Sequence, residues 1–316
     1  MTAQPQPVDA EIVGRPSRLA RLWLLAENRT TLVAGLVFLA LIAYVAFFPL
    51  VSPHDPNDVD FSQGREMPSL EHPLGTDQFG RDLLTRLAVG GQTTLAIAGL
   101  ALAIILVIGF LWGAVAALAG GFVDSLMMRV VDGLFAIPRL PVAIVILVVL
   151  SLHAQNIPAI VLALSIAGWM LTARLVRGHV LALKSRDFVR AARAVGASWP
   201  RIARRHILPN SAGILLVAIF LELPTVVLGE AFLAVLGFGP SAPTATWGNI
   251  AFDGWHFFRM WEMFLATVAI ATFAISANVL ADGFHDLLDP RRQPQRRPRP
   301  ARQRLILARR PRSGHT

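Results

Sequence analysis

The chain has 316 residues, 54% of them hydrophobic and only 16% charged, with a formal net charge of +9. Because about a quarter of the residues in soluble domains are charged, this composition excludes an ordinary soluble domain and indicates an integral membrane protein. The chain has no cysteine, which excludes disulfides, thiol catalysis and thiolate metal sites.

Six membrane spans are predicted in chain order, because a helix that crosses the roughly 30 Å hydrocarbon layer needs about 20 mostly apolar residues. The runs that we assign to them are 31–51, 93–119, 125–152, 157–176, 212–236 and 263–280. No small-residue cleavage site follows the first run, so we interpret it as an uncleaved helix and not as a removed signal peptide. Pro138 and Pro141 remove backbone donors within the third run and predict a kink there.

The distribution of basic residues predicts the orientation of these spans. The two tails and the segment between the fourth and fifth spans hold 23 arginine and lysine residues, whereas the loops after the first and fifth spans hold four. We expect the basic side to be cytoplasmic, so that both termini lie inside the plasma membrane. A five-span or seven-span count would place one basic tail outside and remove this asymmetry.

The C-terminal tail, 290–316, is rich in proline and arginine and has few residues that could pack in a core. We therefore expect it to be disordered. Attraction to anionic lipid headgroups is the favoured interpretation of its charge, ahead of a specific protein or nucleic-acid contact.

The segment 178–210 is strongly basic and is predicted to form a helical hairpin in the cytoplasm. Residues 185–195 are rich in alanine and arginine and predict a first helix, which Gly196 can end in the left-handed conformation. Ser198 can cap a second helix at 199–206.

The tip of this hairpin carries two apolar side chains, Val195 and Trp199, that could anchor it in another surface. In one interpretation, the segment binds a partner protein and transmits the movement of that partner to the spans. In the other, it is a loop whose arginines contact lipid headgroups, and the residues by themselves favour neither.

The stretch RAARAVGASWPRIARRHILPN, 190–210, resembles the EAA loop of ABC importer permeases. The residues that match the pattern of this loop are Ala191, Ala192, Gly196, Ile202, His206, Leu208 and Pro209. Arg190 stands where the family has glutamate.

Three further stretches are similar to the C-type permease subunits of dipeptide, oligopeptide and nickel importers. They are HPLGTDQFGRDLLTRL (72–87), GEAFLAVLGFGPSAPTATWGNI (229–250) and NVLADGFHDLLDPR (278–291). The chain departs from the family at Gln92, where arginine is usual, and at Arg139, where a small polar residue is common.

The resemblance implies an all-α membrane protein with six transmembrane helices, namely the type I ABC importer transmembrane domain with one extra N-terminal span. The expected organisation is a cytoplasmic tail (1–29), the first span with an extracytoplasmic segment (30–90), a transmembrane domain (91–285) that contains the coupling loop 178–210, and the basic tail 290–316.

The partners that the resemblance implies are a sister permease in a heterodimer, two cytoplasmic ABC ATPase subunits, an extracytoplasmic solute-binding protein and membrane lipid. ATP and Mg would bind the ATPase subunits, because this chain contains no Gly-Lys-Ser/Thr sequence for a P-loop. We expect no cofactor, no nucleic-acid partner and no enzymatic activity in this chain.

The implied function is ATP-driven import of dipeptides and oligopeptides across the plasma membrane. Nickel or another small solute is the alternative cargo. An ATP-independent channel or secondary carrier is a different class, and carriers often show an internal repeat that we do not find between the halves of this chain. An intramembrane enzyme would need a catalytic constellation, and the spans offer only isolated carboxylates.

The resemblance also implies the residues of the coupling site on the ATPase. They are Arg190, Ala191, Ala192, Val195, Gly196, Ala197, Ser198, Trp199, Ile202, His206 and Pro209. No catalytic residue and no metal site is expected.

Other polar residues carry two interpretations each. Glu222 and Glu230 would lie within the fifth span, where a carboxylate lines a pathway or forms hydrogen bonds inside the protein. Asp77, Arg81 and Asp82 would meet the binding protein or shape a turn.

Two expectations concern local contacts. Arg129 and Asp132 are spaced for an ion pair within one helix. The tryptophans between the fifth and sixth spans, among them Trp247, are expected at the membrane interface.

Overall fold

The computed structural model describes residues 29–149 and 156–288. Its elements, in chain order, are α2 (Arg29–Val51), η1 (Phe61–Gln63), α3 (Leu83–Ala119), α4 (Gly121–Phe135), α5 (Arg139–Val149), α6 (Ile157–Gly168), α7 (Met170–Lys184), α8 (Asp187–Ala194), α9 (Trp199–Ile202), η2 (Ala203–Ile207), α10 (Leu208–Asn210), α11 (Ala212–Leu233), η3 (Ala234–Phe238), α12 (Trp247–His256) and α13 (Met260–Leu288). The predicted tails, apart from Arg29, and the end of the third predicted span lie outside the described residues.

The described helices account for the predicted spans. Four segments, namely α2, α3, α11 with its continuation η3, and α13, are each long and apolar enough to cross a membrane. The pair α4 and α5 is bent by 87°, and the pair α6 and α7 by 45°. With each bent pair counted as one span, the described part of the chain holds the six spans that the sequence predicts.

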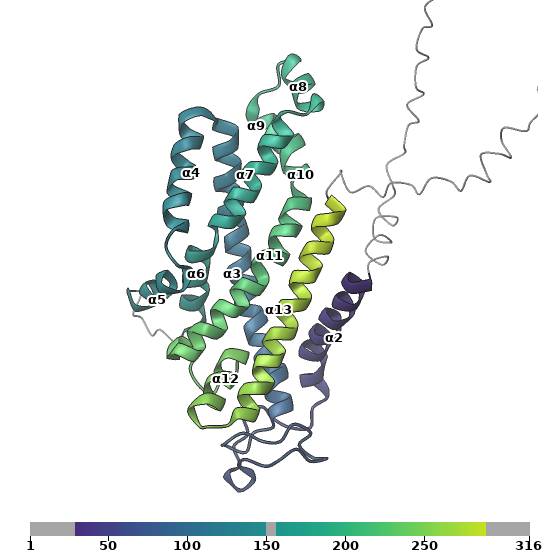
Figure 1. The fold of residues 1–316 in the computed structure, drawn as a ribbon, viewed down its shortest axis with the longest axis vertical. Helices are drawn as coiled ribbons and strands as arrows, with labels where there is room; N and C mark the ends of the chain where they lie inside the picture. The colour runs from purple at the N-terminus through teal and green to yellow at the C-terminus, as the bar shows by residue number, and fades with distance from the viewer. Residues whose placement is uncertain (1–28, 150–155, 289–316) are drawn as a thin grey trace, which may run out of the picture.

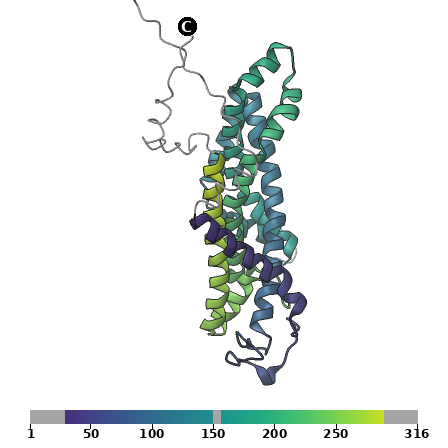
Figure 2. The same cartoon turned by 90° about the vertical axis from the view of Figure 1, so that its right-hand side faces the viewer.

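The spans form an elongated helical bundle whose two ends differ (Figure 1). The hairpin of α8 and α9 extends beyond the bundle at one end. The loop between α2 and α3 lies at the other end, together with α12. Figure 2 shows α2 crossing the outside of the bundle obliquely, where it packs against α3 and α13.

The helix α3 begins at Leu83, well before the predicted start at residue 93, because Asp82 caps it. The Oδ2 atom of Asp82 accepts a hydrogen bond from the Thr85 backbone N–H at 2.8 Å. This bond satisfies one of the free donors of the first helical turn. Hydropathy did not reveal this turn because it contains the charged residue Arg86.

The two bent spans differ from their predictions. The helix α7 continues to Lys184, past the predicted end at residue 176. The basic side chains of this extension have partners in the bundle, since Arg177 pairs with Asp124 of α4 and Lys184 donates to the Ala117 carbonyl of α3. The third predicted span is broken rather than kinked, since α4 ends before Pro138 and α5 begins after it. Pro138 has no backbone N–H to continue the helical hydrogen bonds, and the axes of the two pieces differ by 87°.

Two glycines allow α3 to lie very close to α7. A Cβ atom on Gly113 would lie 2.3 Å from the carbonyl oxygen of Ala173, and one on Gly109 would lie 2.6 Å from Thr172. Small residues of this kind let the backbones of membrane helices approach each other. The α3–α7 contact is therefore set by the absence of side chains at these two positions.

Replacement of Gly113 by alanine is expected to lower the unfolding temperature of the detergent-solubilised protein, because the added methyl group would overlap α7. Overpacking of this kind costs about 1–3 kcal/mol. The matched control is Gly99→Ala in the same helix, where a Cβ atom would meet nothing within 4 Å. Tryptophan fluorescence on heating measures both variants, and equal unfolding temperatures would contradict the close α3–α7 contact.

Candidate functional site

The basic hairpin is built from α8 and α9 on either side of a left-handed glycine, as the sequence predicts. Gly196 has φ +85°, a conformation that strains residues with a Cβ atom. The Gly196 N–H donates to the Arg193 carbonyl at 2.9 Å, and the Ala197 N–H donates to the Ala192 carbonyl at 3.0 Å. This pattern is the Schellman end of a helix, so Gly196 closes α8 and turns the chain toward α9.

The base of the hairpin is fixed to the bundle by apolar packing. Val189, Ile202 and Ile207 are buried, and they pack against the adjoining ends of α3 and α7. Lys184 adds a polar contact, since its Nζ atom donates to the Ala117 carbonyl near the end of α3 at 2.7 Å. The base of the hairpin and the adjoining ends of α3 and α7 therefore form one packed cluster.

The tip of the hairpin displays one of its two predicted anchors. The Val195 side chain is 85% exposed. Trp199 is half-buried, and its ring centre lies 4.9 Å from the Lys184 Nζ atom and 4.7 Å from the Arg193 guanidinium carbon. These cation–π contacts stiffen the hairpin itself, so Val195 is the apolar group most available to a partner.

The predicted coupling residues differ in exposure. The exposed ones are Arg190, Ala191, Val195, Gly196, Ser198 and Pro209. The half-buried members are Ala192, Ala197, Trp199 and His206, and Ile202 is buried. Ser198 stands at the N-cap of α9 as predicted, but its side chain makes no capping hydrogen bond. Arg190 pairs with Asp187 in the first turn of α8.

Two ion pairs join α7 to α4 at the hairpin end of the bundle. Arg177 donates to both carboxylate oxygens of Asp124, at 2.5 and 2.7 Å, and Arg174 donates to Asp132 at 2.7 Å. The predicted pair of Arg129 with Asp132 is therefore wrong. The partner of Asp132 comes from a neighbouring helix, which residue spacing along one helix cannot reveal.

A further ion pair between helices lies at the break between α4 and α5. Arg139 begins α5, and its Nη1 atom donates to Glu222 Oε2 on α11 at 3.1 Å. The Glu222 side chain is fully buried, whereas that of Arg139 is 28% exposed. The second oxygen, Glu222 Oε1, has no hydrogen-bond partner among the described residues. Removal of the arginine would thus leave a carboxylate buried without compensation.

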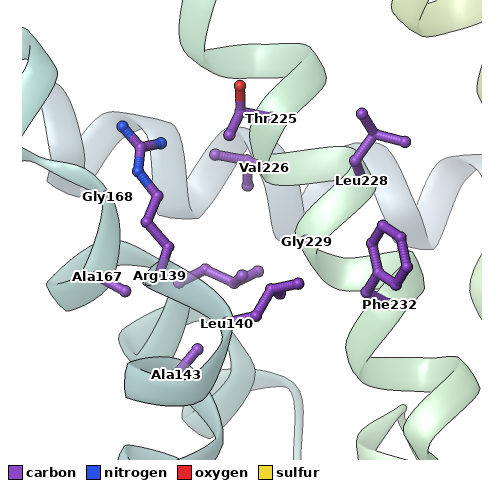
Figure 3. Close-up of a pocket in the computed structure, with 11 residues that line it drawn as sticks. Arg139, Leu140, Ala143, Ala167, Gly168, Thr225, Val226, Leu228, Gly229 and Phe232 are labelled. Carbon is purple, nitrogen blue, oxygen red and sulfur yellow. The ribbon is translucent and has the colours of Figure 1, made fainter. Parts of the chain in front are cut away.

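A pocket of about 220 Å³ lies beside this ion pair, between α5, α6 and α11. Figure 3 shows Leu140 and Phe232 on different walls of the pocket and the long Arg139 side chain along one side. Thr225 is the other polar side chain that lines it. Apolar walls with few polar groups are the usual lining of small-molecule pockets, and this pocket is smaller than the roughly 300–1,000 Å³ typical of them. Glu222, a predicted pathway residue, does not line the pocket. It forms an ion pair with Arg139, and Arg139 lines the pocket.

Glu230, the other predicted pathway residue, contacts α3 instead of the pocket. Its Oε2 atom accepts from the Thr94 hydroxyl at 3.2 Å, and the same hydroxyl accepts from the Trp247 backbone N–H at 3.1 Å. The Trp247 indole N–H donates to the Leu87 carbonyl at 2.9 Å. Glu230 therefore belongs to a hydrogen-bonded cluster that joins α3, α11 and α12. Trp247 is fully buried within it, so this tryptophan is a packing residue of the cluster and not an exposed aromatic anchor in lipid headgroups.

Asp77, Arg81 and Asp82 are buried and shape the loop before α3. Asp77 Oδ2 accepts from Arg81 Nε at 2.6 Å, and Asp82 caps α3. These contacts agree with the interpretation as a structural turn. Contact of the loop with a binding protein stays a prediction. Because these three residues are buried, the exposed surface of the loop, which they support from inside, would form that contact.

Asp253 of α12 lies in the same charged region. Burial raises the pKa of the Asp253 carboxyl, whereas the nearby guanidinium groups of Arg86 and Arg81 lower it. The two arginines thus compensate part of the cost of burying a carboxylate at this end of the bundle.

Two family models match the chain. Residues 105–294 match the model described as binding-protein-dependent transport system inner membrane component. Residues 24–71 match the model described as the N-terminal TM domain of oligopeptide transport permease C. The first match alone covers more than half of the chain and includes the hairpin and the pocket.

Similar proteins of known role span most of the chain. The oligopeptide transport system permease protein OppC of Bacillus subtilis (strain 168) is 36% identical, over 90% of this chain and 93% of its own. The dipeptide transport system permease protein DppC of the same strain is 35% identical, over 90% of this chain and 89% of its own. The OppC of Haemophilus influenzae is 35% identical, over 85% of this chain and 89% of its own.

A solved structure has the same fold. The inward-facing MetNI methionine ABC transporter has a chain with a TM-score of 0.51 to this one at 18% sequence identity. The likeness covers 64% of this chain and 96% of that chain.

Replacement of Arg139 by leucine is expected to destabilise the protein, because it leaves Glu222 buried without its partner. Loss of one member of a buried pair costs about 3–5 kcal/mol. The double variant Arg139→Leu/Glu222→Gln removes the uncompensated charge and should recover most of this loss.

The matched control for this experiment is Arg174→Leu. Its pair with Asp132 is largely exposed, with side chains 36% and 62% accessible, so the expected cost is about 0–1 kcal/mol. Thermal unfolding in detergent compares the variants. If the double variant is no more stable than Arg139→Leu alone, the ion pair is not the source of the effect.

Proposed function

The chain belongs to the family of binding-protein-dependent transport system inner membrane components, and from this premise we propose that it imports dipeptides and oligopeptides in an ATP-driven complex. It is a multi-pass membrane-spanning permease component of an ABC transporter. The similarity to the OppC and DppC permeases over about nine-tenths of the chain carries the proposal of peptide cargo.

The proposed complex contains a sister permease, two ATPase subunits with ATP and Mg, and an extracytoplasmic solute-binding protein. The absence of a P-loop sequence from all 316 residues supports a separate source of energy. The hairpin tip supports contact with an ATPase, because it combines an exposed apolar group, Val195, with a base that is packed onto the bundle.

The hairpin is proposed to carry the motion of the ATPase to the pocket. The hairpin arises from α7, which two ion pairs join to α4. It leads through α10 into α11, which the Arg139–Glu222 pair joins to α5. Both routes reach the broken span that borders the pocket. A displacement of the hairpin would therefore shift α5 and α11 relative to each other, as alternating access requires.

The orientation of the chain is also a proposal. The segment from Arg174 to Arg205, which contains the hairpin, carries nine basic residues, and cytoplasmic segments are enriched in such residues. We therefore place the hairpin and both termini in the cytoplasm, and the loop between α2 and α3 with α12 on the outer face.

Val195→Asp is expected to leave assembly intact but to abolish most of the peptide-stimulated ATPase activity, because a charge replaces the apolar contact of the tip. Gly196→Glu should act in the same way and adds strain of about 1–2 kcal/mol from its positive φ. Activity is measured on the complex reconstituted in vesicles with the binding protein.

The matched control is Gly121→Glu at the start of α4, where φ is also positive at +55°, a Cβ atom meets nothing within 4 Å, and the residue lies outside the segment 178–210. This variant should retain activity. Full transport and full stimulated ATPase activity in Val195→Asp and Gly196→Glu would show that the tip does not couple the subunits.

Orientation can be tested without preparatory mutations, because the chain has no cysteine. In intact spheroplasts, a membrane-impermeant maleimide should label Leu70→Cys in the outer loop and should leave Val195→Cys unlabelled until the membrane is opened. Both side chains are well exposed in the isolated chain. Labelling with the opposite preference would reverse the proposed topology.

Uptake assays distinguish the candidate cargoes. Cells that depend on this transporter should accumulate labelled dipeptides or oligopeptides, and the uptake should require ATP. Uptake of nickel without uptake of peptides would overturn the peptide proposal while leaving the permease role in place. Uptake that persists without the ATPase subunits would indicate a channel or carrier.

A further inference from the structure

Two histidines of the loop between α2 and α3 lie together in a place that transport does not explain. The rings of His54 and His72 are 4.6 Å apart between their centres, with an angle of 37° between their planes. One nitrogen of each ring and one carboxylate oxygen of Asp82 all lie within 4.8 Å of one another. The sequence did not suggest a site here because the residues are scattered along the loop.

The hydrogen bond of His72 assigns its tautomer. The His72 Nδ1 atom lies 3.0 Å from Asp82 Oδ1. A carboxylate accepts, so Nδ1 carries a proton, and Nε2 of the neutral ring is a lone pair. The residue is only 3% exposed, and Nε2 has no hydrogen-bond partner among the described residues. A buried acceptor without a partner is unfavourable.

The hydrogen bond of His54 leads to the same conclusion for the second ring. Its Nε2 atom lies 3.1 Å from the backbone carbonyl oxygen of Glu71. A carbonyl oxygen also accepts, so Nε2 carries the proton and Nδ1 of the neutral ring is a lone pair. His54 is half-buried and therefore reachable from the outer solution.

The carboxylate of Asp82 acts on the first ring and not as a free ligand. Its Oδ2 atom accepts from the Thr85 backbone N–H at 2.8 Å and from the Thr85 hydroxyl at 2.7 Å. Its Oδ1 atom accepts from His72. Metal-binding histidines are typically held in this way, with the second ring nitrogen donating to a carboxylate or a backbone carbonyl. Both histidines of the pair have such a partner.

We propose that His54 and His72 bind a divalent late transition-metal ion on the loop, for which Zn²⁺ is the probe ion. Asp82 and the Glu71 carbonyl are the positioning groups. Imidazole nitrogen is a preferred ligand of Zn²⁺, Ni²⁺ and Cu²⁺, whereas Mg²⁺ and Ca²⁺ take oxygen ligands. Zn–N bonds of about 2.0–2.1 Å require the two lone-pair nitrogens to turn toward a common point, because the tilted rings lie beside each other. Water completes the coordination.

Such an ion would join the end of α2 to the segment that precedes α3. His54 follows α2 closely, and His72 is fixed to the N-cap of α3 through Asp82. Binding to the folded loop alone would stabilise it in proportion to the ion concentration. This inference does not depend on the cargo or on the proposed partners.

The test uses the full-length chain in detergent, purified through a tag that contains no histidine and treated with a chelator. Titration with Zn²⁺ against a chromophoric competitor should give one ion per chain, and Zn²⁺ but not Mg²⁺ should raise the unfolding temperature. His72→Asn keeps a donor toward Asp82 but removes Nε2, and His54→Phe keeps the ring contact but removes the ligand. Each variant should bind Zn²⁺ at least about 10-fold more weakly.

The matched control is His256→Phe, in which an exposed ring stacked on Phe252 of α12 is replaced. It should bind Zn²⁺ like the unmodified chain. Unfolding temperatures without metal show whether each variant is folded. If His72→Asn is unstable, the Zn²⁺ affinity of His54→Phe, at the more exposed position, tests the proposal alone. Unchanged Zn²⁺ affinity in His54→Phe, or the absence of stoichiometric binding to the unmodified chain, would overturn the proposal.

Discussion

Charge compensation across helices is the constraint on which this structure depends. An isolated charge within the hydrocarbon layer is unfavourable, whereas a helical backbone satisfies its own hydrogen bonds. Arg139 and Glu222 compensate each other between α5 and α11, and Arg177 and Asp124 do so between α7 and α4. Each ion pair therefore joins two helices that are distant in sequence. Together the two pairs hold the broken span, α4 with α5, against the rest of the bundle.

The same ties give the hairpin a mechanical connection to the interior. The apolar base of the hairpin is packed on α3 and α7, and the glycines of α3 bring these two helices into close contact. The pocket at the break is bordered by α5 and α11, and the Arg139–Glu222 ion pair joins these two helices. A break that is stabilised by one ion pair is a suitable place for movement, because α5 can rotate without disturbing hydrogen bonds inside a continuous helix.

The opposite end of the bundle is built for rigidity. Asp82 links the cap of α3 to His72, and Asp77 closes the turn with Arg81. Trp247 and Glu230 anchor α12 to α3 and α11 through a chain of hydrogen bonds. In the proposed mechanism, the hairpin end moves and the bundle opens around its pocket, while the α2–α3 loop at the opposite end keeps a constant surface.

The sequence by itself determined the number of spans, the hairpin with its left-handed Gly196, and the position of the break at Pro138. These features depend on local rules, namely hydropathy over one helix length, the conformational freedom of glycine and the missing donor of proline. The early start of α3 is also encoded locally by the capping residue Asp82, although the charge of Arg86 hides it from a hydropathy profile.

Only the tertiary structure decided which charges pair, that Trp247 is buried, that Arg139 lines a pocket, and that His54 meets His72. Asp132 has an arginine nearby in its own helix, yet its partner is Arg174 of another helix. The physical reason is that an ion pair or a shared site depends on distance in space after the helices have packed. Residue spacing specifies that distance within one helix and leaves it undetermined between helices.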